Sequence, residues 1–409
     1  MRRVRVSALR PGVRLAMAVY GARGLLLREG VDLSPAHIDR LQRARVEAVY
    51  VDDPLFTDIQ MPPDVSWEVK SSLLSACSAL WDHFRALDSA GSGTPDSGSG
   101  GVAQGAGARD GAAAAARRGG VRRGDAAGAA QGGGARGGGP ALAEAARWPV
   151  PYERLMEIAS VLEDELRSVP AWAVQMVAGG EDEDGPVVHA VNSSLVAASL
   201  ARQAGLGGYV RELALGGLLH DMGLALLPAH LHLEPDEVAA EDLPLLHTHP
   251  LLGVKLMRGQ PASAYVQAAV AQHHERVDAS GYPRRLRGSR LAAHSQLVAV
   301  ADTFVRLAGQ GRGSSEAWEY VVSGAGSEFD HRLVQAFSQA IPPYPLGSAV
   351  RLSTGEEGVV VGLETGLLTR PRLRLLRDEA GRPLDQPVTY DLAENMHRNR
   401  VIVGEAPDA

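Results

Sequence analysis

The chain has 409 residues, 45% of them hydrophobic, with a formal net charge of −7 and a pI near 6.0. This length suits two or three domains, and the acidic balance excludes a global basic signature for binding a nucleic-acid polymer. The single cysteine, Cys77, excludes an intrachain disulfide framework and favours a reducing compartment. No apolar run approaches the roughly 18 residues of a membrane span, and the basic start lacks an apolar signal-peptide core. We therefore expect a cytoplasmic protein without membrane contact.

Residues 1–60 predict a small α/β segment. Val4–Val6 alternates like a strand, and Ala16–Tyr20 resembles a second strand. Ser34 and Pro35 form a helix start, with the serine as cap and the proline in the first turn. The segment shows no catalytic pattern, so we expect it to serve docking or interaction.

Two further stretches precede the main domain. Residues 64–90 are expected to form one amphipathic helix that packs against a core. Residues 91–140 contain 18 glycines and only two large aliphatic side chains, Val102 and Val121. Such a stretch buries too little apolar surface to offset its ordering entropy. We therefore predict a disordered Gly/Ala/Arg linker over residues 91–145.

Residues 150–345 are expected to be mainly helical. A first helix is predicted over residues 151–178, with an apolar stripe that includes Leu155, Val161 and Leu166. Behind this domain, residues 346–409 alternate and turn like a small β-rich extension. Strands are expected there at residues 350–352, 358–361, 372–376 and 401–403.

Seven potential metal ligands recur between residues 186 and 305. They are His189, His220, Asp221, His249, His273, His274 and Asp302. Neutral imidazoles bind divalent metals well, and a carboxylate can bridge two of them. Two metals roughly 3.5–4 Å apart can hold both oxygens of a phosphoryl displacement and activate a water. Neighbours on a helix diverge by about 100°, so each doublet can direct its side chains to different metals.

The flanking residues strengthen some of these assignments. Leu213–Leu219 is apolar and leads directly into His220-Asp221, and a buried carboxylate after such a run requires a partner. A metal pair meets that requirement. His189 by itself would more often be a structural histidine, and it is interpreted as a ligand because of the set that follows it.

The order of these residues resembles a known family. The pattern is His, then His-Asp, then His-Pro, then His273-His274-Glu275-Arg276 with Gly281-Tyr282-Pro283, and finally Ala-Asp-x-Phe at Asp302. It resembles the HD-GYP domain over roughly residues 150–345. That domain is a bacterial branch of the HD phosphohydrolases, typified by cyclic di-GMP phosphodiesterases.

The resemblance implies a site and its cofactors. It implies two divalent ions (iron, manganese or zinc) on the seven ligands, with Asp221 as the bridge and His220 and Asp221 in catalysis. The loop Gly281-Tyr282-Pro283 would shape the edge of the substrate site. This loop or the N-terminal segment would also contact a signalling partner.

Three departures from the family pattern concern substrate binding. Leu224 stands where the family usually has a lysine that neutralises phosphate. Gly185 stands where some members carry an acid for a third metal, so we expect two metals unless Glu183 or Asp184 reaches the site. The arginine segment after Asp302 is shortened, and Arg306 or Arg312 is the expected replacement for a lost phosphate contact.

Three functions follow from this sequence. The first is hydrolysis of a cyclic dinucleotide, cyclic di-GMP above all, to the linear dinucleotide and then possibly to GMP in bacterial signalling. The second is a weakened module that binds a nucleotide or a signalling partner without useful turnover, which Leu224 motivates. The third is a phosphohydrolase that acts on another nucleotide.

Overall fold

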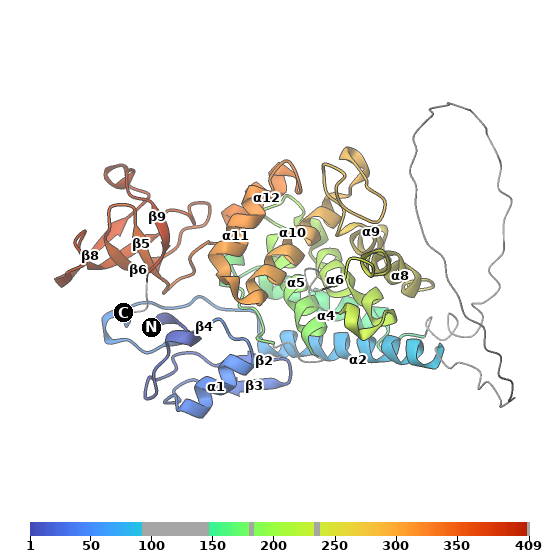
Figure 1. Cartoon of the computed structure of the whole chain (residues 1–409), viewed down its shortest axis with the longest axis horizontal. Helices are drawn as coiled ribbons and strands as arrows, with labels where there is room; N and C mark the ends of the chain where they lie inside the picture. The colour runs from blue at the N-terminus through green and yellow to red at the C-terminus, as the bar shows by residue number, and fades with distance from the viewer. Residues whose placement is uncertain (92–146, 180–183, 233–237, 407–409) are drawn as a thin grey trace, which may run out of the picture.

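The computed structural model describes residues 1–91, 147–179, 184–232 and 238–406, and a helical domain lies at its centre (Figure 1). Its helices are α2 (Trp67–Gly91), α4 (Tyr152–Leu166), α5 (Gly185–Leu200), α6 (Val210–Leu219), α7 (Leu243–Leu246), α8 (His249–Leu256), α9 (Ala264–Gln272), α10 (Ala293–Leu307), α11 (Gly313–Ser323) and α12 (His331–Ala340). This confirms the expected mainly helical fold with β-rich segments at both ends. The predicted linker lies outside the described residues from residue 92 onward, and the expected domain limits stay predictions.

Helix α5 is the centre of the packing. It is buried on nearly all sides, and its predicted core positions Val188, Val191 and Leu195 are all inaccessible or nearly so. A helix that is apolar all round belongs inside a domain rather than at its surface. Helices α2 and α4 cover one side of the α5–α6 pair, and α9 and α10 cover the other. This packing fixes the positions of the helix ends that carry most of the histidines.

The helix expected over residues 151–178 is wrong beyond Leu166. Helix α4 ends there, Pro170 follows, and a short 3-10 turn at Ala171–Ala173 leads into extended backbone. The amide of Val177 in that extended stretch donates to the Asn192 side chain at 2.8 Å instead of to a helical carbonyl. Val161, predicted to face the core, is 51% exposed on the outer face of α4.

The N-terminal segment contains two small antiparallel pairs and one helix. Strand β1 (Arg2–Arg5) pairs with β4 (Ala48–Val51), and β2 (Val19–Gly21) pairs with β3 (Gly24–Leu27). Helix α1 (Pro35–Arg43) starts as predicted, because the Ser34 hydroxyl accepts from the His37 amide at 3.2 Å. Both early strands differ from the predicted ranges, since Val6–Ala8 is a 3-10 turn and β2 begins at Val19.

The C-terminal residues form a five-stranded antiparallel sheet in the order β8-β7-β6-β5-β9. Its strands are β5 (Ala349–Leu352), β6 (Glu357–Gly362), β7 (Arg372–Arg377), β8 (Pro383–Asp391) and β9 (Ile402–Glu405). Strand β8 was not predicted. It lies at an edge, is mostly exposed and contains two prolines, so it shows no apolar alternation.

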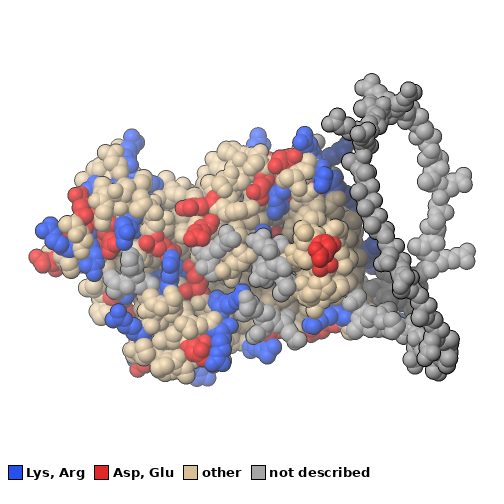
Figure 2. Space-filling view, in the orientation of Figure 1, with Lys and Arg blue, Asp and Glu red and all other residues tan. Residues whose placement is uncertain are grey.

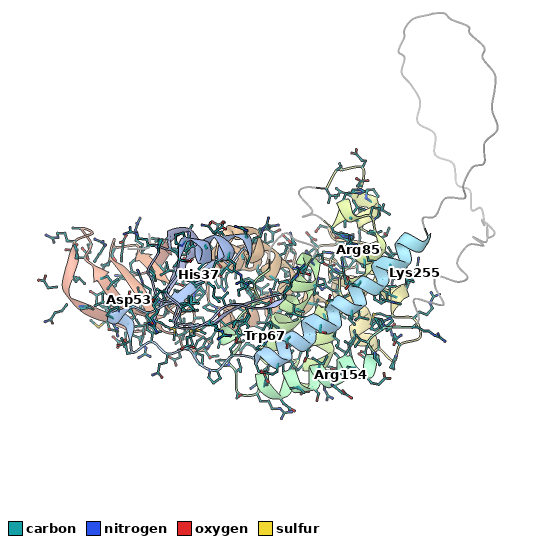
Figure 3. All side chains as sticks on the ribbon, turned by 90° about the horizontal axis from the view of Figure 1, so that it is seen from below. His37, Asp53, Trp67, Arg85, Arg154 and Lys255 are labelled. Carbon is teal, nitrogen blue, oxygen red and sulfur yellow. The ribbon has the colours of Figure 1, made fainter. Side chains whose placement is uncertain are left out.

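The two ends of the chain pack against each other (Figure 1). Phe56 and Ile59 join the core of the C-terminal sheet, and the Arg374 guanidinium contacts both Asp58 carboxylate oxygens at 2.6 and 2.8 Å. The N-terminal segment and the C-terminal sheet therefore lie together at one end of the helical domain (Figure 1). Figure 3 shows α2 running from Trp67, which is labelled at its start, along the underside of the helices.

The surface carries both signs of charge. On the face drawn in Figure 2, arginine and lysine side chains alternate with aspartate and glutamate without a broad region of either sign. Among the described residues, no helix has the length and apolar composition needed to cross a bilayer.

The contact between α5 and α6 depends on Gly217. A β-carbon at this position would lie 2.7 Å from the Ser194 backbone, where neither helix can yield cheaply. We expect Gly217→Ala to lower the free energy of unfolding by about 1–3 kcal/mol, as overpacking of a tight core does. Gly208→Ala is the matched control, because a β-carbon there meets nothing within 4 Å. Urea unfolding of both variants measures the difference, and equal stability of the two would contradict the packing argument.

Candidate metal centre

The His-Asp doublet lies at a break between two helical segments. Helix α6 ends at Leu219, His220 caps it, and Asp221 precedes the 3-10 turn η5 (Met222–Leu226). This position places both side chains inside the domain, where His220 is fully buried and Asp221 only slightly accessible. The apolar run before the doublet therefore buries it, as the sequence indicated.

Three of the histidines are oriented in the same way. The Nδ1 atom of each lies at hydrogen-bond distance from the backbone carbonyl three residues earlier. The distances are 2.7 Å for His220 to Gly217, 2.8 Å for His249 to Leu246 and 3.0 Å for His273 to Val270. Helix ends leave such carbonyls without an intrahelical partner. Because Nδ1 donates to the backbone, Nε2 is the nitrogen left to bind a metal.

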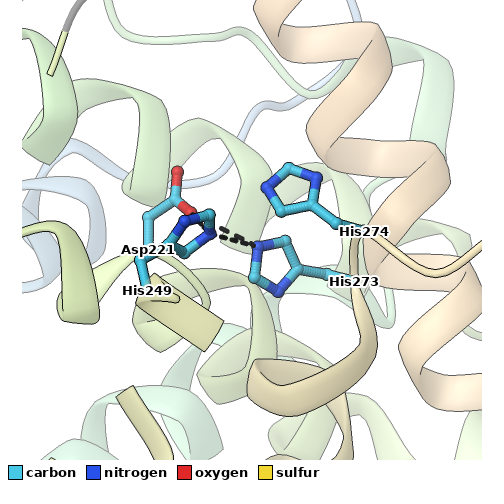
Figure 4. A group of neighbouring side chains, drawn as sticks. All are labelled: Asp221, His249, His273 and His274. Carbon is cyan, nitrogen blue, oxygen red and sulfur yellow. Dashed lines mark hydrogen bonds and ion pairs between the residues drawn. The ribbon is translucent and has the colours of Figure 1, made fainter. Parts of the chain in front are cut away.

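The Asp221 carboxylate divides between two groups of histidines, and Figure 4 draws the group of His249, His273 and His274. Its Oδ1 lies 3.2 Å from His249 Nε2 and 3.3 Å from His273 Nε2. Its Oδ2 lies 3.2 Å from His220 Nε2 and 3.9 Å from His189 Nε2. His274 completes the first group, and the possible ligand atoms within each group lie within 4.8 Å of one another.

Asp302 supports the second group. Its Oδ1 lies 3.0 Å from His189 Nε2 and 3.8 Å from His220 Nε2. The residue lies within α10, directly after the apolar run Leu297–Ala301, and the helix continues past it to Leu307. The structure thus brings all seven predicted ligands together from α5, α8, α10, the C-terminal end of α9 and the α6–η5 break.

Burial and neighbouring charges set the protonation of the cluster. Burial would raise the pKa of Asp221 and Asp302, but the surrounding histidines hold both pKa values well below the usual range. Burial lowers the pKa of His273 and His274, so both imidazoles are neutral. Burial would also lower the pKa of His220, yet Asp221 and Asp302 outweigh it and raise the pKa to about 9. Ionised carboxylates and mostly neutral imidazoles are the forms that bind metals.

Polar atoms of this cluster are incompletely satisfied by the protein. His220 Nε2, Asp221 Oδ1 and Asp302 Oδ2 are buried and form no well-aligned hydrogen bond with the described residues, although His220 Nε2 and Asp221 Oδ1 lie at the ion-pair distances given above. Leaving such atoms without a partner is costly, and mixed imidazole and carboxylate donors suit divalent transition metals. The donor set therefore fits two divalent ions that share Asp221.

Glu275 anchors the loop that follows the histidine doublet. This carboxylate is 2% exposed, and it accepts from the Arg284 amide at 2.6 Å and the Leu286 amide at 2.8 Å. Gly281 lies so close to the preceding segment that a β-carbon would lie 2.2 Å from the His274 carbonyl oxygen. The loop is thereby folded back onto the metal ligands.

From this loop, the Tyr282 ring stacks on two imidazole rings. Its ring stacks on His274 with centroids 4.6 Å apart and on His247 with centroids 3.7 Å apart. Burial, together with Asp221 and Asp302, raises the pKa of its hydroxyl well above the usual value. The Gly-Tyr-Pro loop thus positions a metal ligand, a role that the sequence did not indicate for it.

A cavity of about 1060 Å³ opens over the cluster. Metal-centre residues that line it are His189, Asp221, His249, His274, Tyr282 and Asp302. Its other walls come from α2, the extended stretch before α5, and the N-terminal segment. The cavity has the size of known small-molecule sites, which measure about 300–1,000 Å³.

Only some of the other predicted residues lie at the cavity. Arg306 lines the cavity, and its Nε is buried without a hydrogen-bond partner in the described part of the chain. The Arg312 side chain and Glu183 lie outside the described residues. Asp184 pairs with Arg23 at 2.8 Å, so it does not reach the cluster. Leu224 lines the cavity and packs into two apolar clusters.

Sequence reasoning missed Lys70 at this site. Lys70 is 5% exposed, lines the cavity and donates to the Asp64 carboxylate at 2.5 Å, and burial lowers its pKa. It is one of only two lysines in the chain, the other being Lys255. A charged residue within the apolar stripe of α2 was the available signal.

Comparison with known proteins agrees with this geometry. Residues 155–333 match the family model described as HD domain, and residues 349–403 match the KOW domain associated with HD domain. The central part of the chain is therefore an HD domain, and its His-His-Glu-Arg and Gly-Tyr-Pro motifs make it one of the HD-GYP type. The family resemblance inferred from the sequence is confirmed.

Named relatives have related activities. The cyclic di-GMP phosphodiesterase PA4108 of Pseudomonas aeruginosa is 30% identical over 230 residues, which cover 54% of this chain and 55% of that protein. The 3'3'-cGAMP-specific phosphodiesterase 2 of Vibrio cholerae is 29% identical over 126 residues, covering 29% and 24%. A solved structure of Bd1817, a HDG"Y"P protein from Bdellovibrio bacteriovorus, aligns over 82% of this chain and 97% of that one, with 17% identity and a TM-score of 0.42.

Glu275 offers a test of how the loop is held. In Glu275→Gln, an amide group would face one of the two backbone N–H donors, and the loop would lose one hydrogen bond in a buried setting. We expect the free energy of unfolding to fall by about 1–3 kcal/mol. Glu319→Gln, on the exposed face of α11, is the control. Thermal unfolding with both variants at one pH reports the effect, and an unchanged midpoint for Glu275→Gln would refute the anchoring role.

Proposed function

We propose that the chain hydrolyses a phosphodiester bond of a cyclic dinucleotide, with cyclic di-GMP as its substrate in bacterial signalling. A water oxygen bonds to phosphorus, the P–O3′ bond breaks, and the 3′ oxygen leaves with a proton. The first product is the linear dinucleotide, and a second hydrolysis gives GMP. The division of the Asp221 carboxylate between two groups of histidines carries this proposal, because it matches what a binuclear phosphodiesterase centre requires.

The seven predicted ligands would hold two divalent ions, one on each side of Asp221. When bound, such ions supply Lewis-acid activation of a water and of the phosphate. The residues themselves fix the geometry: backbone carbonyls orient the imidazoles of His220, His249 and His273, and Tyr282 holds the ring of His274. Iron, manganese and zinc all suit this donor set.

Two cations in the cavity suit the charge of the substrate. Arg306 presents a guanidinium whose Nε is buried without a partner, and Lys70 has donors beyond the one given to Asp64. Arginine and lysine both bind phosphate oxygens by charge-assisted hydrogen bonds. We assign Arg306 to the phosphate, while the contact predicted for Arg312 lies outside the described side chains.

The loop Gly281-Tyr282-Pro283 and the N-terminal segment are the proposed contacts for a signalling partner. Ser280, Arg284 and Arg285 beside the loop are exposed and available to such a protein. Because cyclic dinucleotide messengers act inside bacterial cells, the proposal also requires a cytoplasmic location.

The direct test is a time course of cyclic di-GMP hydrolysis. Purified protein is supplied with manganese or with ferrous iron under anaerobic conditions, bound metal is quantified, and the products are separated chromatographically. Linear dinucleotide formed at about two metals per chain supports the proposal. Full metal content with intact substrate would overturn it.

A second candidate function uses the same site but binds the nucleotide without turnover. Leu224 supplies no charge at the position where the family usually has a lysine, and its packing in two apolar clusters favours a module that binds nucleotide without turnover. The cGAMP-specific relative also favours a substrate with one adenine. Equal assays with cyclic di-GMP and 3'3'-cGAMP, each with a binding measurement, separate these functions.

Metal content should respond to Asp221 more than to any ligand of one group. We expect Asp221→Asn to reduce bound metal from about two ions per chain to fewer than one, because both groups share this carboxylate. His189→Ala, which affects one group, should leave about one ion. Asp82→Asn on the exposed face of α2 is the control. Elemental analysis after gel filtration gives the counts, and two retained ions in Asp221→Asn would exclude the bridge.

Arg306 should contribute to substrate affinity. We expect Arg306→Gln to raise KM for cyclic di-GMP about 10- to 150-fold, the equivalent of about 1.5–3 kcal/mol for a hydrogen bond to a charged group. Steady-state kinetics of this variant are compared with Arg258→Gln, which changes an exposed arginine outside the cavity lining. Equal KM values for the two variants would remove Arg306 from the substrate site.

A further inference from the structure

The cavity over the metal centre has a second end of different chemistry. There its walls include Tyr20, Trp67, Trp172 and Met176, which we call the aromatic end. Aromatic residues make up only 5% of the chain, so their gathering on one cavity wall is not explained by composition. Met176 is 37% exposed and the three aromatic residues are half-buried, so this wall keeps apolar surface that the protein core does not cover.

Backbone contacts place the aromatic end close to the metal ligands. The Tyr20 carbonyl accepts from the Ala178 amide at 3.0 Å. The neighbouring Gly179 lies against Val188, whose side chain would be 2.7 Å from an added β-carbon. Val188 directly precedes the metal ligand His189 in α5. The Tyr20 backbone is thus separated from the metal centre by the extended residues 177–179 and the first turn of α5.

Tyr20 and Trp67 form a stacked pair of aromatic rings, which we call the platform. Their rings stack with centroids 4.5 Å apart and an interplanar angle of 16°. Trp67, labelled in Figure 3, is the first residue of α2, and Lys70 follows one turn later and lines the same cavity. A stacked pair loses little conformational freedom when a third ring is added, so the platform binds a planar ligand at low entropic cost.

We propose that the aromatic end is a base-stacking subsite, in which Trp67 receives one nucleobase of the cyclic dinucleotide while a phosphodiester lies at the metal centre. This inference rests on the proposed function, and it names a specificity element outside the HD match of residues 155–333. Tyr20 stiffens the platform, and Lys70 faces the backbone of the same nucleotide. Stacking accepts any base, so the subsite selects for a dinucleotide over a small phosphodiester rather than for guanine over adenine.

Two variants at position 67 separate stacking from packing. Trp67→Leu keeps an apolar side chain, although a smaller one, and removes the π-face; Trp67→Phe restores a π-face. Binding is measured by calorimetry on the metal-loaded full chain, with a phosphorothioate analogue of cyclic di-GMP that resists hydrolysis. KM and kcat for cyclic di-GMP are measured in parallel, and thermal unfolding checks that each variant is folded. Trp148→Leu is the matched control, since Trp148 is also half-buried but lies outside the cavity lining.

We expect Trp67→Leu to weaken analogue binding and raise KM about 5- to 150-fold, the range that corresponds to stacking of one base. Trp67→Phe should recover most of the loss, kcat should change little, and Trp148→Leu should bind as the wild type does. Wild-type affinity in a folded Trp67→Leu variant would overturn the subsite. Equal losses in the Leu and Phe variants would also overturn it, because the effect would then come from packing.

The proposed function can fail separately. If the wild type binds the analogue with dependence on Trp67 but hydrolyses no cyclic di-GMP, the phosphodiesterase activity is refuted and the base subsite stands. If cyclic di-GMP is hydrolysed with the same KM by wild type and Trp67→Leu, the subsite is refuted and the activity stands.

Discussion

The site depends on one carboxylate that serves two sets of imidazoles. Asp221 points one oxygen at His249 and His273 and the other at His220 and His189. This is possible only because the residue lies at a break, where α6 has ended and η5 has not yet begun. In the middle of a helix, the Asp221 side chain would point toward one group of histidines only. The break between α6 and η5 lets it point between the two groups.

Helix ends also determine the orientation of the imidazole rings. A helix terminus leaves carbonyls that need donors, and His220 and His273 supply them from the cap position itself. One contact therefore satisfies a backbone group and selects the nitrogen that faces the metal. The two carboxylates are buried, and the histidines around them hold the pKa of both well below the usual range. Under the proposed function, divalent ions would compensate this negative charge, so metal binding and the stability of the domain would be coupled.

The metal ligands could be predicted from sequence because their signals are local. An apolar run that ends in His-Asp must bury a charge, and doublets on helices fix relative directions; the isolated ligands His189, His249 and Asp302 follow from the HD-GYP pattern. The walls of the cavity could not be predicted in this way. Tyr20, Trp67 and Met176 are distant in sequence and look like ordinary core residues, and tertiary contacts such as the pairing of β2 with residue 178 bring them together. Residues 167–178 were misassigned for a related reason, since their amides find partners in Asp64 and Asn192.

Leu224 lacks the positive charge that the family usually has at this position, and residues distant in sequence bring positive charge to the same cavity. Leu224 joins two apolar clusters on either side of η5, and a lysine there would leave that contact unfilled. The cavity nevertheless receives cationic side chains from other elements, Lys70 from α2 and Arg306 from α10. Lys70 comes from a helix that precedes the matched HD region, which begins at residue 155. Under the proposed function, positive charge for the phosphates is therefore supplied in part by the segment that also provides the aromatic wall. Under the same proposal, residues before the HD domain complete the substrate cavity, and the domain on its own would lack part of its binding site.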